Sequence, residues 1–376
     1  MRILILATGF KPQYRVLRCA SALHHEVFVA GQGGALLLGF SRFCKRLYRC
    51  DFQTWHQSKV VEFINSLVAQ LQIDVVLPSD AITTRLLARI GPELVGEVYP
   101  VPSERLFERL GHKDTFMELC ASLAVRHPRS LLVRDVHELK KVVSGDEFPA
   151  PFVVKSTNRS GGDGIFRVLD KSDFQSISKM IDYAPILIQE HIPGSDISMS
   201  LFCRSGKAVA AVVFERDSKF FRCMLHESFR AEAERIAAAT QFDGVINFDG
   251  ILTADGEVVF LECNPRFFYS MDLVMLGSGV NFVEIGLGGE LGRADCKRYV
   301  PHPIRLWRSI APSIFTPWRL EKSDLSFVRY TLADPVVAIL LASSFDLRFP
   351  SAAATLSAYA LRRTERAPAL PQRLPS

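Results

Sequence analysis

Residues 245–266 read VINFDGILTADGEVVFLECNPR, and their pattern decides how the rest of the chain is interpreted. Asp255-Gly256 separates two apolar runs, and Asp-Gly in that setting is a strong signal for a two-residue β-hairpin turn. Counting outward from this turn places two pairs of polar residues opposite each other: Asp249 with Glu262, and Asn247 with Asn264. Because alternate residues of a strand point to the same side, the sequence predicts that all four side chains share one face of the hairpin.

Opposed carboxylates make this face chemically unusual. Asp249 and Glu262 repel each other unless a cation or a shared proton lies between them. Carboxylate and amide oxygens are ligands that Mg²⁺ accepts, and a small set of protein ligands leaves positions for phosphate oxygens and water. A solvated hairpin face is the alternative. Ile251 and Phe260 are expected further along the same face, which would make it half buried, so the pattern favours a divalent-cation site.

A second motif is an apolar strand that ends in a lysine and is followed by a glycine-rich loop. Residues 152–164 read FVVKSTNRSGGDG. Glycines let the backbone approach a polyanion, and the loop amides together with Lys155 can neutralise phosphate oxygens. No GK[ST] follows the glycines, so this is not a Walker loop. Lys113, at the start of a helix, is another candidate phosphate contact, with a solvated surface lysine as the alternative.

The third motif is the apolar strand 186–190, which runs into the loop HIPGSD at 191–196. Backbone groups at such a strand exit can pair with the edge of adenine, and a carboxylate such as Asp196 can accept hydrogen bonds from ribose hydroxyls. A plain strand end is the alternative interpretation. The motif gains weight only in combination with the other two.

The composition is that of a folded protein without a nucleic-acid partner. Of 376 residues, 48% are hydrophobic and 23% charged, and at about 150 residues per domain the length predicts two or three domains. The net charge of +5 is spread along the chain, which does not favour nucleic acid. The eight cysteines contain no CxxC pair, so we expect reduced thiols.

Two apolar segments are too short for targeting or for crossing a membrane. Residues 3–7 are shorter than a signal-peptide core and predict a buried first strand, so we expect a cytoplasmic protein. Residues 336–345 fall short of the ~20 residues that a membrane span needs. They predict a packing helix, and the chain is expected to have no transmembrane segment.

Residues 1–105 alternate short apolar runs with helical stretches, including an amphipathic helix over 60–72. Strands are expected in four places: 3–7, 26–30, 74–78 and 98–101. This alternation predicts a parallel sheet covered by helices. The glycines at 31–34 lack the spacing of a dinucleotide-binding motif and are interpreted as a strand-to-loop exit. From 106 onward, strands and helices mix in an α+β pattern.

Taken in order, the three motifs resemble the ATP-grasp superfamily, and the run Glu262-Cys263-Asn264-Pro265-Arg266 is similar to the branch that contains the carbamoyl phosphate synthetase large subunit, biotin carboxylase and many amino-acid ligases. The resemblance covers about residues 100–285. It implies an α/β and α+β protein with an N-terminal Rossmann-like parallel-sheet domain, an ATP-grasp domain of two α+β subdomains that clasp ATP, and a short C-terminal extension. The expected ranges are 1–105, 106–289 with a small lid subdomain at about 125–190, and 290–376.

The resemblance also implies roles for individual residues. Mg²⁺, or Mn²⁺ in its place, would be bound by Asp249, Glu262 and Asn264, while Arg266 and Lys155 would be catalytic, with Arg266 stabilising an acyl phosphate. The ATP-binding residues implied in this way are Lys113, Lys155, Ser160, Gly161, Gly162, Gly164, Gln189, Glu190, Ile192 and Asp196.

The implied reaction is ATP-dependent formation of an amide or peptide bond between a small-molecule carboxylate and an amine, with release of ADP and phosphate. Two alternatives stay open: an ATP-dependent carboxylase or carbamoyl-type enzyme, and a catalytically silent ATP-binding protein. Family members are often dimers, so a homodimer is an expectation.

The acceptor part of the sequence departs from the family pattern. Residues 215–226 lack the Gly-Gly-rich loop of many relatives, so Arg216, Arg222 and His226 are candidate substrate contacts, with a solvated strand edge as the alternative. Phe267-Phe268-Tyr269 follow the motif arginine and predict an apolar substrate wall, which argues against bicarbonate.

Overall fold

The structure is a computed structural model that describes residues 1–145, 147–159, 162–216, 220–289, 299–301 and 322–343. The chain forms two compact units. Residues 1–103, 217–223 and 266–376 make up the first unit, and residues 104–216 and 224–265 make up the second. The domain boundaries expected at residues 105 and 289 stay predictions.

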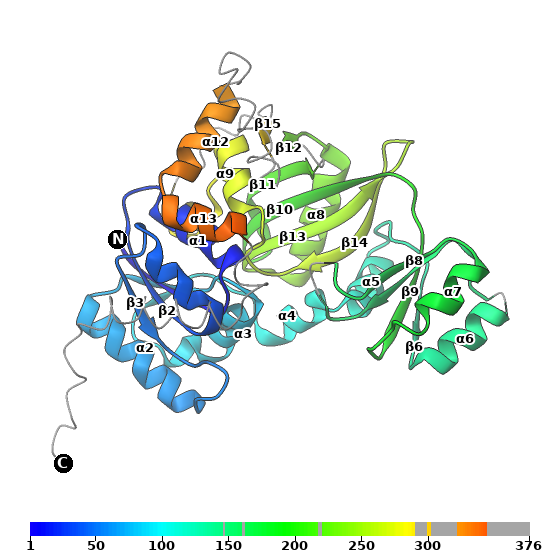
Figure 1. Cartoon of the computed structure of the whole chain (residues 1–376), viewed down its shortest axis with the longest axis horizontal. Coiled ribbons are helices and arrows are strands. Elements are labelled where there is room, and N and C mark those ends of the chain that lie inside the picture. Colours follow the sequence, from blue (N-terminus) through cyan, green and yellow to red (C-terminus); the bar gives the residue numbers. More distant parts are fainter. Residues whose placement is uncertain (146, 160–161, 217–219, 290–298, 302–321, 344–376) are drawn as a thin grey trace. The chain divides into compact units, whose positions relative to one another are not determined.

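Five parallel strands form the sheet of the first unit, in the order β3-β2-β1-β4-β5. Figure 1 labels two of them, β2 and β3. The strands are β1 (Arg2–Ala7), β2 (Glu26–Gly31), β3 (Arg46–Arg49), β4 (Val75–Leu77) and β5 (Glu97–Val98). The connecting helices are α1 (Lys11–Ser21), η1 (Gly33–Phe40), α2 (Gln57–Leu71), α3 (Ala81–Ile90) and η2 (Gly91–Glu93). The predicted parallel sheet is confirmed, and its central strand is an unbroken apolar run because helices cover both faces.

The later part of the first unit is mostly helical. Its elements are β12 (Phe220–Met224), α9 (Met271–Ser278), α10 (Phe282–Gly286), β15 (Tyr299–Pro301), α12 (Lys322–Leu332) and α13 (Pro335–Ser343). Strands β12 and β15 pair antiparallel. Helix α13 confirms the packing helix predicted over 336–345. Among the described residues, no helix is both long enough and apolar enough to cross a membrane.

Helix α1 buries charged side chains, which explains why apolar periodicity did not reveal it. Arg15 and Arg18 are 4% and 5% exposed. Arg15 forms an ion pair with Asp272 of α9, and the Tyr330 hydroxyl of α12 donates to the same carboxylate at 3.0 Å. The Arg18 guanidinium lies 3.7 Å from the centre of the Tyr330 ring. Charged and aromatic side chains therefore join α1, α9 and α12.

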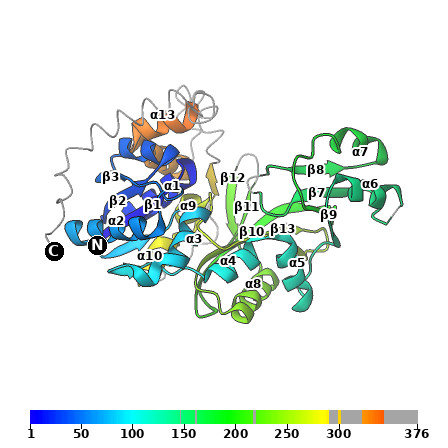
Figure 2. The same ribbon diagram turned by 90° about the horizontal axis from the view of Figure 1, so that it is seen from below.

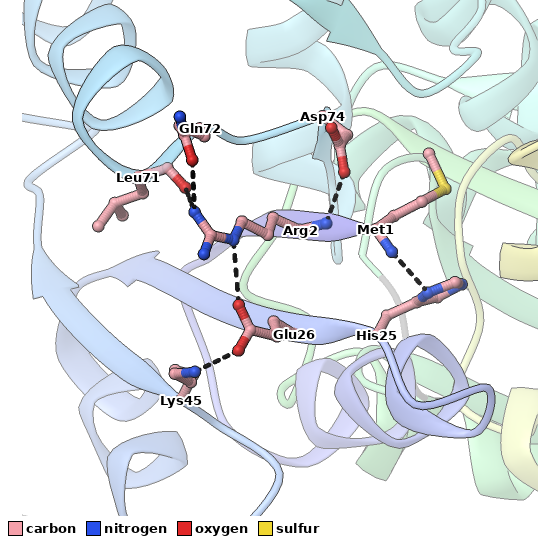
Figure 3. Close-up of polar contacts among 8 residues, drawn as sticks. All are labelled: Met1, Arg2, His25, Glu26, Lys45, Leu71, Gln72 and Asp74. Carbon is pink, nitrogen blue, oxygen red and sulfur yellow. Dashed lines mark hydrogen bonds and ion pairs between the residues drawn. The ribbon is translucent and has the colours of Figure 1, made fainter.

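Arg2 ties together the amino-terminal edge of the parallel sheet (Figure 3). Its backbone N–H donates to Asp74 Oδ2 at 2.7 Å, and its Nε donates to Glu26 Oε2 at 3.1 Å. Its Nη1 donates to the Leu71 carbonyl at 2.9 Å, at the carboxyl end of α2. Glu26 also pairs with Lys45. One arginine thus connects β1 to β2 and to the end of a covering helix.

The second unit contains two antiparallel sheets. In the first of them, strands run in the order β14-β13-β10-β11: β10 (Ser195–Arg204), β11 (Lys207–Arg216), β13 (Gly244–Leu252) and β14 (Val258–Asn264). The smaller sheet has the order β6-β9-β7-β8: β6 (Ser130–Val133), β7 (Phe152–Ser156), β8 (Ile165–Val168) and β9 (Ile186–Glu190). Strand β9 was predicted with these bounds, whereas β6 was not expected.

Helices cover one face of each of these sheets. Helices α4 (Glu104–Gly111), α5 (Lys113–Ser122) and α8 (Glu227–Thr240) lie on the same side of β10 and β13 in Figure 2 and share an apolar core with them. Helices α6 (Val136–Ser144) and α7 (Lys171–Ile177) pack on the smaller sheet. The predicted fold class is confirmed: a parallel α/β sheet precedes two antiparallel sheets, each with one face left for polar side chains.

Candidate functional site

Asp249 and Glu262 lie opposite each other in the β13–β14 ladder, as the sequence predicts. Asn247 and Asn264 form the next pair along the same face. Phe248, the residue between the two β13 members, points the other way and is fully buried in the core. Strand alternation therefore leaves all four polar side chains on the face that α5 and α8 do not cover.

The hairpin reaches this register by a different route from the predicted one. The Thr253 N–H donates to the Glu257 carbonyl at 2.9 Å, so the turn is a three-residue loop, with Gly256 at a φ of +82°. The longer loop shifts the pairing by one residue. A bulge next to Asp249 shifts it back. The two deviations cancel at the carboxylate pair, and the predicted pairing there is confirmed.

Between the loop and the bulge, the one-residue shift in strand pairing changes which side chains face the core. Phe260 was expected beside Ile251 on the polar face, and that expectation is wrong. Phe260 is 1% exposed, and its ring centroid lies 4.9 Å from that of Phe229 and 5.7 Å from that of Phe248 in the core. Ile251 pairs with Val259 instead. A slip of one residue exchanges the two faces of a strand.

Hydrogen bonds fix both carboxylates. The Ser198 hydroxyl of β10 donates to Asp249 Oδ1 at 2.6 Å. Asn264 Nδ2 donates to Asp249 Oδ2 at 3.2 Å and to Glu262 Oε1 at 3.5 Å. The asparagine amide thus bridges the two acids, and its carbonyl oxygen would be a further ligand for a divalent cation held by them.

Lys113 links this acidic face to the loop after β7. Its Nζ lies 3.4 Å from Glu262 Oε2 and donates to the Arg159 carbonyl at 2.7 Å. Its backbone N–H donates to the Thr157 carbonyl at 3.0 Å. The side chain is 6% exposed, so it is not a solvated surface lysine. The first residue of α5 is held between a carboxylate and the loop backbone.

Lys155 supplies a second buried ammonium group. It is 6% exposed at the end of β7, and burial lowers its pKa to about 8, with a further lowering from Lys113 and an opposing effect of Glu262 and Asp249. Within the part of the chain that the structure describes, no carboxylate oxygen lies within 4.0 Å of its Nζ. A lysine with little water around it and no direct counter-ion attracts an anionic ligand strongly.

The glycine-rich loop is described only in part. Ser160 and Gly161 lie outside the described residues. Gly162 and Gly164 have φ values of +84° and +68°, which only glycine adopts without strain. The Tyr183 hydroxyl donates to the Gly164 carbonyl at 2.6 Å, which anchors the end of the loop.

The residues at the end of β9 and in the loop that follows differ in burial and in the surface that they line. Gln189 is 1% exposed and its Nε2 donates to Ser130 Oγ at 3.0 Å. The exposed Glu190 and its neighbour Ile192 line a hollow of about 790 Å³, together with Arg126, His127 and the hairpin loop. Asp196 is exposed on β10, opposite Ile251.

Four further candidates have their own local settings. Arg266 donates to the Phe267 carbonyl at 3.1 Å and belongs to the first unit. Arg222 lies in β12, opposite Tyr299, and Arg216 ends β11. His226 caps α8 by accepting from the Phe229 N–H, a structural role that the sequence did not suggest.

The predicted aromatic wall behaves mostly as core. Phe267 and Phe268 are 3% and 6% exposed, and they pack on Tyr99 and Phe282 within the first unit. Tyr269 is exposed. The first two residues stabilise the unit, so they give no evidence against a small substrate such as bicarbonate.

Three serines that the sequence analysis missed complete the polar faces. Ser198 and Ser200 of β10 donate to Asp249 and Asn247, and Ser130 accepts from Gln189. The alternation of polar residues at 196, 198 and 200 could have revealed the first two, since it marks one face of a strand. No local signal marks Ser130, whose importance depends on its partner across the sheet.

The donor set fits a hard divalent cation. Asp249 and Glu262 offer carboxylate oxygens, and Asn264 offers an amide oxygen on the same face. Over the described residues, there is no group of three His, Cys, Asp or Glu side chains placed to hold a metal. A cation held by the three donors Asp249, Glu262 and Asn264 would keep open positions for phosphate oxygens and water.

Comparisons with known proteins also point to ATP-grasp proteins, which the three sequence motifs resemble. Residues 182–308 match a family model described as "ATP-grasp in the biosynthetic pathway with Ter operon". The arginine-specific carbamoyl phosphate synthase large chain of Geobacillus stearothermophilus is 24% identical over 224 residues, which cover 55% of this chain and 21% of that protein. The chain thus spans about a fifth of the length of this curated relative.

Solved structures share the fold. N5-carboxyaminoimidazole ribonucleotide synthetase with bound ADP matches with a TM-score of 0.66 at 14% identity, over 82% of this chain and 85% of that one. The Aspergillus clavatus carboxyaminoimidazole ribonucleotide synthase complexed with ATP gives 0.62 at 15% identity, over 80% of both chains. The biotin carboxylase domain of Hydrogenobacter thermophilus 2-oxoglutarate carboxylase, with MgADP and bicarbonate, gives 0.59 at 16% identity, over 79% and 72%. Residues 182–308 thus match an ATP-grasp family model, and the chain shares the fold of these ATP- and ADP-bound structures.

Proposed function

We propose that this protein is a carboxylate–amine ligase that activates a carboxylate as an acyl phosphate on Mg-ATP and then forms an amide or peptide bond. The observation that carries the proposal is the carboxylate pair Asp249 and Glu262, bridged by Asn264, with two buried lysines on the same side of the fold. Two acids and two ammonium groups suit a polyphosphate with its metal better than they suit a neutral ligand.

The chemistry requires activation of the acid, because a carboxylate is a poor electrophile at neutral pH. A substrate carboxylate oxygen attacks the γ-phosphorus of ATP, the bond to the β-phosphate oxygen breaks, and ADP leaves. The amine then attacks the acyl carbon, phosphate leaves, and the amine loses a proton. Lys113 and Lys155 hold the phosphates and balance the charge that develops on the transferring group. Asp249, Glu262 and Asn264 would hold magnesium, which would supply further charge neutralisation.

The remaining roles belong to the same proposal. The loop 160–164 covers the phosphates, Gln189, Glu190 and Ile192 meet the adenine, and Asp196 meets the ribose. Arg266 stabilises the acyl phosphate. Mn²⁺ replaces Mg²⁺ without loss of the donor set. The substrates are a small carboxylate and a small amine of a biosynthetic pathway, in line with the family description, and the enzyme acts in the cytoplasm as a homodimer.

Release of ADP and phosphate tests the proposal. Purified protein with Mg-ATP is assayed against pooled carboxylates and pooled amines, beside Glu262→Gln. We expect release that needs both pools and is lost in the variant. AMP and pyrophosphate as products would refute the acyl-phosphate route. Mg-ATP binding without turnover in any combination would support a catalytically silent ATP-binding protein.

A second candidate is an ATP-dependent carboxylase or carbamoyl-type enzyme. It is favoured by the fold shared with a biotin carboxylase domain described with bicarbonate. The same assay separates the two. ADP release that depends on bicarbonate and an amine, with no need for the carboxylate pool, would favour carboxylation over ligation.

A further inference from the structure

The side chain of Gln189 has incomplete hydrogen bonding in a buried place. It is 1% exposed, and its Nε2 donates to Ser130 Oγ at 3.0 Å. Its Oε1 is buried and has no hydrogen-bond partner among the residues that the structure describes. Buried polar atoms without a partner are rare and call for an explanation.

The orientation of this amide follows from the hydrogen bonds of Ser130. The Ser130 hydroxyl donates to the Pro128 carbonyl at 2.9 Å, and a carbonyl oxygen can only accept. The single hydroxyl proton of Ser130 is therefore committed, and its oxygen is left to accept. Only the NH₂ end of the Gln189 amide can donate to it. The carbonyl end of the Gln189 amide must therefore point away from Ser130, although its oxygen and nitrogen are similar in size.

The amide oxygen belongs to the face of the small sheet that carries Lys155. Gln189 pairs with Val153 of β7, and Leu187, two residues earlier on β9, pairs with Lys155. The intervening Ile188 points to the opposite face, into the core under α6 and α7. Strand alternation thus puts the amide and the lysine on one side. Lys155 in turn is close enough to Asp249 and Glu262 for their charges to affect its pKa.

We infer that Ser130 sets the direction of the Gln189 amide so that the site presents an acceptor and selects a nucleobase with a donor at that position. Adenine carries an amino group at position 6, whereas guanine carries a carbonyl oxygen there. A fixed acceptor binds the first and repels the second. Ser130 is thus a positioning residue for base selectivity. This inference rests on the proposed nucleotide site.

Two variants of Ser130 separate positioning from folding. The affinities of Mg-ATP, Mg-GTP and Mg-purine riboside triphosphate, which lacks the amino group, are measured by calorimetry for wild type, Ser130→Ala and Ser130→Thr. We expect the wild type to bind Mg-ATP about tenfold or more tightly than the other two. Ser130→Ala frees the amide to turn, and the ATP-to-GTP ratio should fall about fivefold or more. Ser130→Thr keeps the hydroxyl and should keep the ratio.

A variant of Gln189 makes the test independent of stability. In a Gln189→Glu background both side-chain oxygens accept, so adding Ser130→Ala should leave the ATP-to-GTP ratio unchanged. Equal losses of ATP and GTP affinity in Ser130→Ala would assign Ser130 a purely structural role, with Gln189 Oε1 satisfied by a buried water, and would overturn the inference alone. A wild type that binds neither nucleotide would overturn the proposed function as well.

Discussion

Two clusters of buried charge, one in each unit, differ in how their charges are matched. In the first unit, Arg15 and Asp272 form an ion pair, and the Tyr330 hydroxyl donates a hydrogen bond to the same carboxylate. In the second unit, two carboxylates face each other across a ladder, and the buried Lys155 has its pKa lowered to about 8. Both clusters contain buried charged groups, but only the second holds a buried ammonium group, that of Lys155, with no carboxylate in direct contact among the described residues.

The way in which buried charges are matched indicates whether a cluster stabilises the fold or binds a ligand. A cluster whose opposite charges are in direct contact holds helices together, as the first does for α1, α9 and α12. A cluster that opposes like charges and leaves an ammonium without a direct partner is costly in the free protein, and a ligand of complementary charge can offset that cost. The same chemical substitution should therefore act in opposite ways at the two places.

The largest effect is expected for Asp272→Asn in the first cluster. The change leaves the guanidinium of Arg15 buried without its anion, and breaking a buried pair in this way costs about 3–5 kcal/mol. Urea unfolding should show a correspondingly lower midpoint. Glu234→Gln, in the exposed Arg230–Glu234 pair of α8, is the matched control and should cost about 0.5 kcal/mol or less. Equal losses in both variants would remove the distinction between the clusters.

Asp249→Asn is the same substitution in the second cluster. It removes one of two opposed carboxylates, so the free energy of unfolding should stay within about 1 kcal/mol of the wild-type value or rise. ADP release should fall about a hundredfold or more, because a metal ligand is lost. Unfolding and turnover measured on the same preparation check both parts. A strongly destabilised variant would show that the carboxylate pair is structural.

The affinity for Mg-ATP should depend on pH through Lys155 of the second cluster. As the pH rises through about 8, Lys155 loses its proton and with it the attraction for phosphate. The dissociation constant of Mg-ATP should therefore increase above that pH, by up to about tenfold per pH unit for one linked proton. Lys155→Arg stays charged throughout and should bind with a flatter profile. Identical profiles in both proteins would assign the titration to another group.

The smallest effect is expected at the edge of the parallel sheet, where charges are partly exposed. Arg2→Lys keeps the positive charge but loses the forked contact to Glu26 and the Leu71 carbonyl. Stability should fall by about 1 kcal/mol, as for one or two ordinary hydrogen bonds, with turnover unchanged. Thermal unfolding measures the loss. A drop as large as that of Asp272→Asn would place this network with the buried cluster.

Local patterns predicted much of the fold and part of the site. Apolar runs revealed β1, β2 and β4 of the parallel sheet, and strand β9 was predicted residue for residue. Strand β3 (Arg46–Arg49), which carries an arginine at each end, was missed. Helix α1 was missed because Arg15 and Arg18 lie on its buried side, where periodicity expects apolar residues. The placement of Phe260 failed because neither the loop length nor the bulge leaves a clear mark in the sequence.

The hairpin around Asp255-Gly256 and the alternation of its faces follow from the sequence, since turn signals and strand alternation are local properties. The bulge beside Asp249 then brings Asp249 and Glu262 to one face. Only the tertiary structure decided that Lys113 reaches Glu262 and that Ser130 orients Gln189. Those contacts join residues 149 and 59 positions apart in the chain. Their geometry depends on how helices and strands pack, which no neighbouring residue encodes.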